Sequence, residues 1–86
     1  METPAAALPL PDTCTEEAGV DLYAAKDLAE LPATSAGACC ALCQSNPACS
    51  AWTYVDKDWT LACYLKGNSG WQRKPCADCT SGLVDR

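Results

Sequence analysis

The stretch Cys39-Cys40-Ala41-Leu42-Cys43-Gln44-Ser45-Asn46-Pro47-Ala48-Cys49 decides the fold of this chain, because it places four of the eight cysteines within eleven residues. Cys39, Leu42 and Cys43 stand at i, i+3 and i+4, so on a helix they share one face. Cys40 is rotated by about 100° from Cys39 on such a helix and needs a partner elsewhere. The spacing therefore predicts a helix that disulfide bonds hold on two sides.

The sequence also marks both ends of this helix. Ser35, or Thr34, is a suitable N-cap residue, although Ala38 stands where a capping box would have Glu or Gln. Asn46-Pro47 ends the helix, because the residue before a proline avoids the helical conformation.

Size and cysteine content are those of a disulfide scaffold. The 86 residues allow one domain, and a core of this size usually needs cross-links to be stable. The even number of cysteines permits complete pairing. Eight cysteines admit on the order of 100 pairings, however, and the sequence alone does not choose among them.

Two other uses of the cysteines agree less well with the sequence. Cys40-x-x-Cys43 and Cys76-x-x-Cys79 could form a zinc site, but 32 residues separate the two pairs and the chain has no histidine. A redox-active Cys76-x-x-Cys79 would need a helix N-terminus, whereas this pair follows Pro75, and Asp78 disfavours a thiolate. We therefore expect structural disulfides, no metal and no cofactor.

Charge and hydropathy exclude several classes of partner. The net charge of −5 opposes binding to nucleic acid or to anionic lipid, and the basic pair Arg73-Lys74 is too small to reverse this. No apolar stretch is long enough to span a bilayer. Residues 1–13 are rich in Pro and Ala and lack the basic start of a signal peptide. We expect a linker or tail over 1–13 and one domain over 14–86, cut from a larger protein that is secreted or lies at the cell surface.

Short strands are expected around the helix. Segments rich in β-branched and aromatic residues predict four of them, at residues 20–23, 49–55, 61–66 and 81–84. We expect an irregular connection over 24–32, a hairpin turn at 56–58 and a polar loop over 71–80. The last strand would then be an edge strand. Alternation puts Leu61, Cys63 and Leu65 on the face toward the helix.

The pattern from Cys14 to Val84 resembles a PAN/apple domain. The resemblance rests on Cys39-x-x-x-Cys43, Asn46-Pro-Ala-Cys49, Ser50-Ala-Trp-Thr-Tyr54 and Cys63-Tyr-Leu-Lys66. The doubled cysteine and the late Cys76-x-x-Cys79 resemble variants in secreted repeat proteins of oomycetes, algae and other protists. The resemblance implies an α+β fold, a small disulfide-rich domain in which an antiparallel sheet of about five strands wraps around one helix.

The resemblance also implies a disulfide pattern. Carried over by position, it gives the bridges Cys39–Cys63 and Cys43–Cys49, with Cys14 reaching the C-terminal segment. Our expectation is a bridge Cys14–Cys79, which leaves Cys40–Cys76 as the additional one. The partners in these last two bridges could be exchanged.

PAN/apple modules bind proteins or carbohydrates and are not enzymes, and the residues of this chain agree. Glu16-Glu17 are adjacent and point in different directions, and Asp56 and Asp58 lie in a predicted turn, where acids are usually solvated. Neither pair is a good acid/base pair for glycoside hydrolysis.

Aromatic residues are the better candidates for ligand contact, because their rings stack on sugars and anchor interfaces. Trp52 lies in a central predicted strand and is expected in the core. The candidate ligand-binding residues are Trp59, Trp71, Tyr64 and Lys66, the last of which matches a lysine of the family.

Two functions are consistent with these candidates. The first is a carbohydrate-binding adhesion module, which we favour. The alternative is a protein–protein module that assembles with neighbouring domains of a larger secreted protein. The partner is accordingly a glycan or another extracellular protein.

Overall fold

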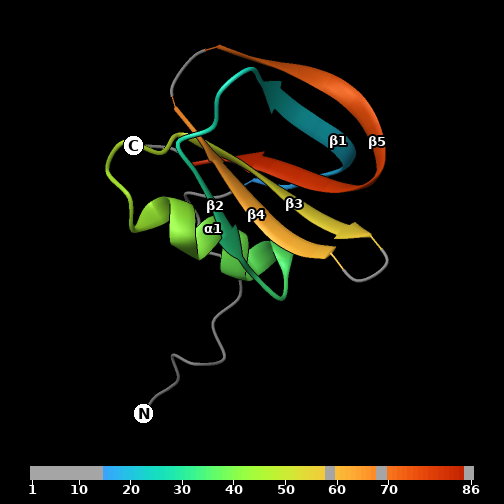
Figure 1. The fold of residues 1–86 in the computed structure, drawn as a ribbon, viewed down its shortest axis with the longest axis horizontal. Coiled ribbons are helices and arrows are strands. Elements are labelled where there is room, and N and C mark those ends of the chain that lie inside the picture. The colour runs from blue at the N-terminus through green and yellow to red at the C-terminus, as the bar shows by residue number, and fades with distance from the viewer. Residues whose placement is uncertain (1–14, 58–59, 68–69, 85–86) are drawn as a thin grey trace.

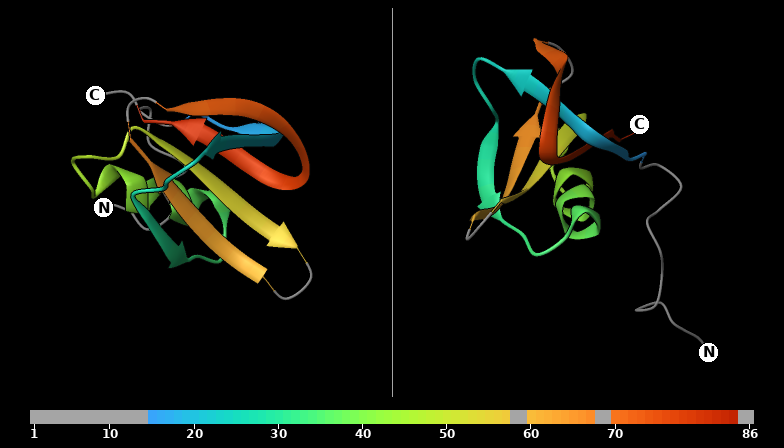
Figure 2. Two further views of the ribbon diagram at one scale, coloured as in Figure 1. Left: turned by 45° about the horizontal axis from the view of Figure 1, so that its top comes forward. Right: turned by 90° about the vertical axis from the view of Figure 1, so that its right-hand side faces the viewer.

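The computed structural model describes residues 15–57, 60–67 and 70–84. These contain one helix and five strands: β1 (Glu17–Ala24), β2 (Ala29–Pro32), α1 (Ala36–Gln44), β3 (Ala51–Lys57), β4 (Thr60–Lys66) and β5 (Trp71–Leu83). The strands form one antiparallel sheet in the order β1-β5-β3-β4-β2, and α1 packs against one face of β3 and β4 (Figures 1 and 2). The predicted α+β class is confirmed.

The helix begins and ends where its sequence indicates. Ser35 has an extended backbone and its Oγ accepts a hydrogen bond of 3.0 Å from the N–H of Ala38, which satisfies a free donor of the first turn. After Gln44 the chain turns at Asn46, whose Oδ1 accepts a 2.9 Å hydrogen bond from the N–H of Ala48. This turn brings Cys49 back toward the end of the helix.

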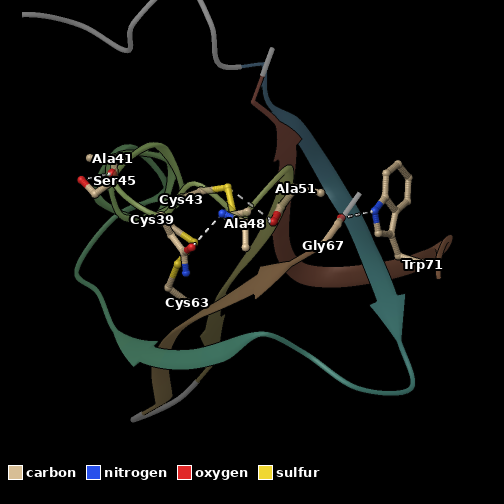
Figure 3. The surroundings of a disulfide bond; sticks show 11 residues. Cys39, Ala41, Cys43, Ser45, Ala48, Ala51, Cys63, Gly67 and Trp71 are labelled. Carbon is tan, nitrogen blue, oxygen red and sulfur yellow. Dashed lines mark hydrogen bonds between the residues drawn. A yellow bond between two sulfur atoms is a disulfide. The ribbon is translucent and has the colours of Figure 1, made fainter. Parts of the chain in front are cut away.

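Two disulfide bonds hold α1, one to β4 and one to the segment just before β3. The bridges Cys39–Cys63 (Figure 3) and Cys43–Cys49 are both present, as the resemblance implies. All four of these cysteines are fully buried. They share a core with Trp52, Tyr54, Leu65 and Val84, so the prediction that Trp52 lies in the core is confirmed.

The other two expected bridges are wrong. Cys76 is bonded to Cys79, three residues away, so neither Cys14–Cys79 nor Cys40–Cys76 can form. An irregularity in β5 brings the Cα atoms of Cys76 and Cys79 to 5.3 Å, within the normal range for a disulfide. Cys40 is buried and disulfide-bonded, and Cys14 lies outside the described residues.

The C-terminal third differs most from the prediction. Residues 71–80, expected as a loop, and 81–83, expected in an edge strand, form the single strand β5 between β1 and β3. The edge strands of the sheet are β1 and β2. Strand β2 lies within residues 24–32, which were expected to form an irregular connection. Alternation is hidden in β5 because its halves differ: Trp71–Pro75 pairs with β1 alone, whereas 79–83 pair with β3 and, at Thr80 and Ser81, also with β1. The strands predicted at 49–55 and 61–66 are observed as β3 and β4, and their ends differ from the prediction by at most two residues. Lys57, which was expected in the turn, is the last residue of β3.

The sheet is strongly bent, because β1 and the first half of β5 form a ribbon over its second face (Figures 1 and 2). We call β1 together with Trp71–Pro75 the β1–β5 ribbon. Leu22 of β1 is buried beneath it with Thr53 and Ser81. The N–H of Leu22 donates a 3.1 Å hydrogen bond to Thr53 Oγ1, which joins the ribbon to β3.

Candidate ligand-binding site

A pocket of about 260 Å³ lies between the β1–β5 ribbon and the sheet. Its walls come from β1, the connection after it, β3 and β4. The lining residues are Asp21, Tyr23, Ala24, Asp27, Val55, Tyr64 and Lys66.

Strand alternation places these side chains. On β4, Cys63 and Leu65 belong to the core beneath the helix, so Tyr64 and Lys66 project from the opposite face. The predicted inward face of β4 is confirmed for Cys63 and Leu65, whereas Leu61 at the strand end is 43% exposed. On β1, Asp21 and Tyr23 are two residues apart and meet the β4 side chains in the pocket.

Lys66 supplies a buried positive charge in the pocket. Its residue is 3% exposed, and its Nζ forms an ion pair with the carboxylate of Asp27. The same Nζ lies 5.5 Å from the centroid of the Tyr64 ring, within the range of a cation–π contact. The buried ammonium is therefore held in one place between a carboxylate and an aromatic ring.

Tyr64 has an altered acidity. Burial raises the pKa of its hydroxyl above the ordinary value of 10.0, and the carboxylates of Glu30, Asp27 and Asp21 raise it further. Glu30 is the residue directly opposite Tyr64 on β2. The Tyr64 hydroxyl therefore stays protonated at neutral pH and is a hydrogen-bond donor in an acidic environment.

Tyr23 forms the exposed rim, with 48% of its surface accessible. The Nζ of Lys74 lies 4.3 Å from the centroid of the Tyr23 ring, and Lys74 stands opposite Asp21 across the ribbon. The pocket thus combines two aromatic rings, two aspartates, a buried lysine and a second lysine near its rim. Such a set can stack on an apolar ligand face and can both donate and accept hydrogen bonds.

The structure brings together two of the four predicted ligand-binding residues. Tyr64 and Lys66 line the same pocket. Trp71 does not line it: the ring is half-buried, and its Nε1 donates a 3.0 Å hydrogen bond to the carbonyl of Gly67 (Figure 3). Trp59 lies outside the described residues.

Sequence reasoning missed Asp21, Tyr23 and Asp27. Alternation within the predicted strand 20–23 would have put Asp21 and Tyr23 on one face. No local signal indicates that this face meets β4, because the contact depends on how β5 bends. Asp27 lies in the connection to β2, where its ion pair with Lys66 spans 39 residues of sequence.

A second hollow, of about 590 Å³, lies on the helix side. Its lining is largely apolar and uncharged, and we call it the α1–β2 groove: Pro32, Ala33, Thr34, Ala38, Ala41, Leu42, Ser45 and Leu61. The described part of the chain holds no cluster of three or more potential metal ligands. It also holds no helix that is long and apolar enough to cross a membrane.

Comparison with models of protein families matches residues 20–66 to the PAN domain. The matched segment is more than half of the chain and extends from β1 to the end of β4. It includes Cys39–Cys63 and Cys43–Cys49 and all lining residues of the pocket. Among curated proteins and solved structures, no match was found.

Proposed function

Because the chain belongs to the PAN domain family, whose members are protein- or carbohydrate-binding modules, we propose that it is a carbohydrate-binding adhesion module. The observation that carries the proposal is the joint position of Tyr64 and Lys66, together with Tyr23, in one pocket. PAN domains are generally non-catalytic, so the proposed activity is recognition alone.

The pocket suits a sugar ring in size and chemistry. Its volume of about 260 Å³ is slightly below the usual range of small-molecule sites, roughly 300–1,000 Å³, which fits a ligand as small as one sugar ring. A sugar presents an apolar face for the Tyr23 or Tyr64 ring and hydroxyl groups around its edge. The carboxylates of Asp21 and Asp27 can accept hydrogen bonds from these hydroxyl groups, and Lys66 can donate to their oxygen atoms.

Disulfide-rich PAN domains are typical of extracellular proteins. On this basis the proposed location is outside the cell or on its surface, where disulfide bonds persist. The proposed context is a larger protein in which further domains stand beside this one. Several weak sugar-binding sites in one protein could together give strong attachment through avidity.

A glycan array probed with the oxidised protein tests this function. We expect binding to a defined group of glycans, and for one such glycan an affinity loss of at least about tenfold in Tyr64→Ala and in Tyr23→Ala. Leu61→Ala is the matched control, because it removes an exposed apolar side chain from the other hollow. An array without signal, or equal binding by all variants, would reject the proposal.

The α1–β2 groove favours the alternative, a protein–protein module. It is larger and more apolar than the pocket, and Leu61 stands exposed within it. Under this alternative, Leu61→Asp would abolish capture of an extracellular protein partner, whereas Tyr64→Ala would leave capture intact. Glycan binding that depends on Tyr64 therefore separates the two functions.

A further inference from the structure

The Cys76–Cys79 bridge closes an irregularity in the β1–β5 ribbon. Val20 of β1 pairs with Pro75, but Ala18, two residues earlier, pairs with Thr80. Residues 76–79 of β5 therefore lie opposite one residue of β1, Gly19, whose positive φ of 79° is readily adopted by glycine. We call residues 76–79 the β5 bulge.

This bridge differs from the other described disulfides in access and loop length. Cys39, Cys43, Cys49 and Cys63 have no exposed surface, whereas Cys76 is partly exposed and Cys79 is 5% exposed. An attacking thiolate must reach a sulfur atom, so exposure favours the bulge bridge as its target. Its sequence separation of 3, against 6 and 24, also gives it the smallest stabilisation from loop closure.

The bulge also joins the pocket wall to the rest of the sheet. After the bulge, β5 pairs with β3 as well as with β1, whereas in the described residues Trp71–Pro75 pairs with β1 alone. The same part of β1 carries Asp21 and Tyr23, which line the pocket. Cross-linking of the bulge therefore restrains the strand pair that forms one side of the site.

We propose that the Cys76–Cys79 disulfide is a redox-sensitive switch that sets the order of the β1–β5 ribbon and, through it, the pocket. A dithiol reductant supplies two electrons and two protons. Its thiolate attacks one sulfur of the bridge to form a mixed disulfide, the second thiol of the reductant resolves it, and Cys76 and Cys79 leave as thiols while the reductant becomes a disulfide. The consequence for sugar binding rests on the proposed function, whereas the consequence for the ribbon does not.

The first test measures which bridge is reduced. The native protein is treated with limiting dithiothreitol, quenched by alkylation and mapped by peptide mass spectrometry. We expect Cys76 and Cys79 to be labelled at least ~10-fold faster than Cys39, Cys43, Cys49 and Cys63, because access controls the exchange. Equal or slower labelling of the Cys76–Cys79 pair would overturn the proposal.

The second test measures the ribbon by hydrogen exchange. In Cys76→Ser/Cys79→Ser we expect amides of 20–24 and 71–74 to exchange about 5- to 30-fold faster, while amides of α1 and β4 keep their protection. Should that variant fail to fold, the selectively reduced and alkylated native protein takes its place. Unchanged exchange in the ribbon, or equal acceleration throughout the protein, would contradict a local switch.

The third test connects the switch to the proposed function. Selectively reduced protein is applied to the glycan to which the oxidised protein binds best on the array, and we expect at least about a fivefold loss of affinity, recovered on reoxidation. Unaltered affinity together with a loosened ribbon would overturn the coupling to the pocket. Absence of glycan binding by the oxidised protein would instead reject the proposed function, and the first two tests would still decide the redox step.

Discussion

The hydroxyl groups of Thr53 and Ser81 lie 2.8 Å apart and complete a buried chain of hydrogen bonds across three strands. Ser81 donates a 2.6 Å hydrogen bond to the carbonyl of Val20, so Thr53 is the donor to Ser81. Thr53 in turn accepts from the N–H of Leu22. This series of hydrogen bonds therefore begins and ends at backbone groups of the edge strand β1. Without it, these backbone groups would need water or another strand as a partner.

Replacing Thr53 with Val should destabilise the protein although the two side chains have nearly the same shape. The change leaves the N–H of Leu22 without its acceptor and Ser81 without its donor, inside a buried site. We expect a loss of about 1–3 kcal/mol in the free energy of unfolding, measured by urea denaturation. Thr53→Ser keeps the hydroxyl and is the control: a loss as large as that of Thr53→Val would show that packing, not hydrogen bonding, is responsible.

Gly82 is required because another part of the chain passes directly over it. A Cβ atom there would lie 2.6 Å from Cζ2 of Trp52 and would overlap the carbonyl of Thr15. We expect Gly82→Ala to lower the free energy of unfolding by about 3 kcal/mol, because neither a buried indole nor a backbone segment yields easily.

Gly67→Ala is the matched control for that substitution. A Cβ at Gly67 meets no atom within 4 Å. Thermal unfolding of the two variants should therefore differ widely, with Gly67→Ala close to the wild type. Similar melting temperatures would mean that the segment above Gly82 can move aside.

The helix could be predicted because its information is local, whereas the pairings Cys39–Cys63 and Cys43–Cys49 came from the resemblance to the PAN/apple domain. Ser35, Cys39, Cys43 and Asn46-Pro47 lie within one short segment, and helical spacing relates their positions directly. The position of β5 could not be predicted in the same way. Its first half pairs with β1 alone, its second half pairs with both β1 and β3, and the Cys76–Cys79 bulge interrupts the alternation that marks a strand.

In the candidate site, too, the residues marked by local sequence could be predicted and those brought in by the tertiary fold could not. Tyr64 and Lys66 were identified from β4 and its resemblance to a family motif, and alternation placed both on the face opposite the helix. Trp71 is an aromatic residue in a polar segment, but it begins β5, and its indole donates a hydrogen bond to the carbonyl of Gly67, which follows β4. Asp21 and Tyr23 reach the pocket through the bend of the ribbon, which is a tertiary feature without a local pattern.

The ion pair between Lys66 and Asp27 should respond unequally to removal of either partner. The side chain of Lys66 is 4% exposed and that of Asp27 is 27% exposed. Asp27→Asn leaves a buried ammonium without its counter-charge and should cost about 3–5 kcal/mol of stability. Lys66→Met leaves a carboxylate that water can reach, and replaces the buried stem with an apolar side chain of similar length, so we expect a smaller loss.

Chemical denaturation of these two variants and of the double variant decides this point. In Lys66→Met/Asp27→Asn the buried charge is gone, so the double variant should be more stable than Asp27→Asn alone. A larger loss in Lys66→Met than in Asp27→Asn would show that Asp27 is the partner that water does not reach.

The Glu17–Arg73 pair should make the stability depend on pH in the acid range. The Arg73 guanidinium donates two hydrogen bonds to Glu17, from Nε to Oε1 at 3.0 Å and from Nη2 to Oε2 at 2.9 Å. These bonds, and then the charge of Arg73, hold the pKa of Glu17 below its ordinary value of 4.5. Glu17 pairs with Ser81 beyond the β5 bulge and Arg73 precedes it, so the ion pair spans the bulge.

The sign of the effect follows from the lowered pKa. The ionised Glu17 favours the folded protein, so its contribution is complete above about pH 4.5 and disappears as the pH falls through the lower pKa of the folded state. Melting temperatures of the wild type and of Glu17→Gln should therefore differ most near pH 7 and converge as the pH falls below the lowered pKa of Glu17, and salt should reduce the difference at neutral pH. Glu16→Gln, at the exposed neighbouring residue, removes the same charge and corrects for the change in net charge. A difference between wild type and Glu17→Gln that persists well below the lowered pKa of Glu17, where residue 17 is neutral in both proteins, would assign the contribution to packing of the side chain instead of to the ion pair across the bulge.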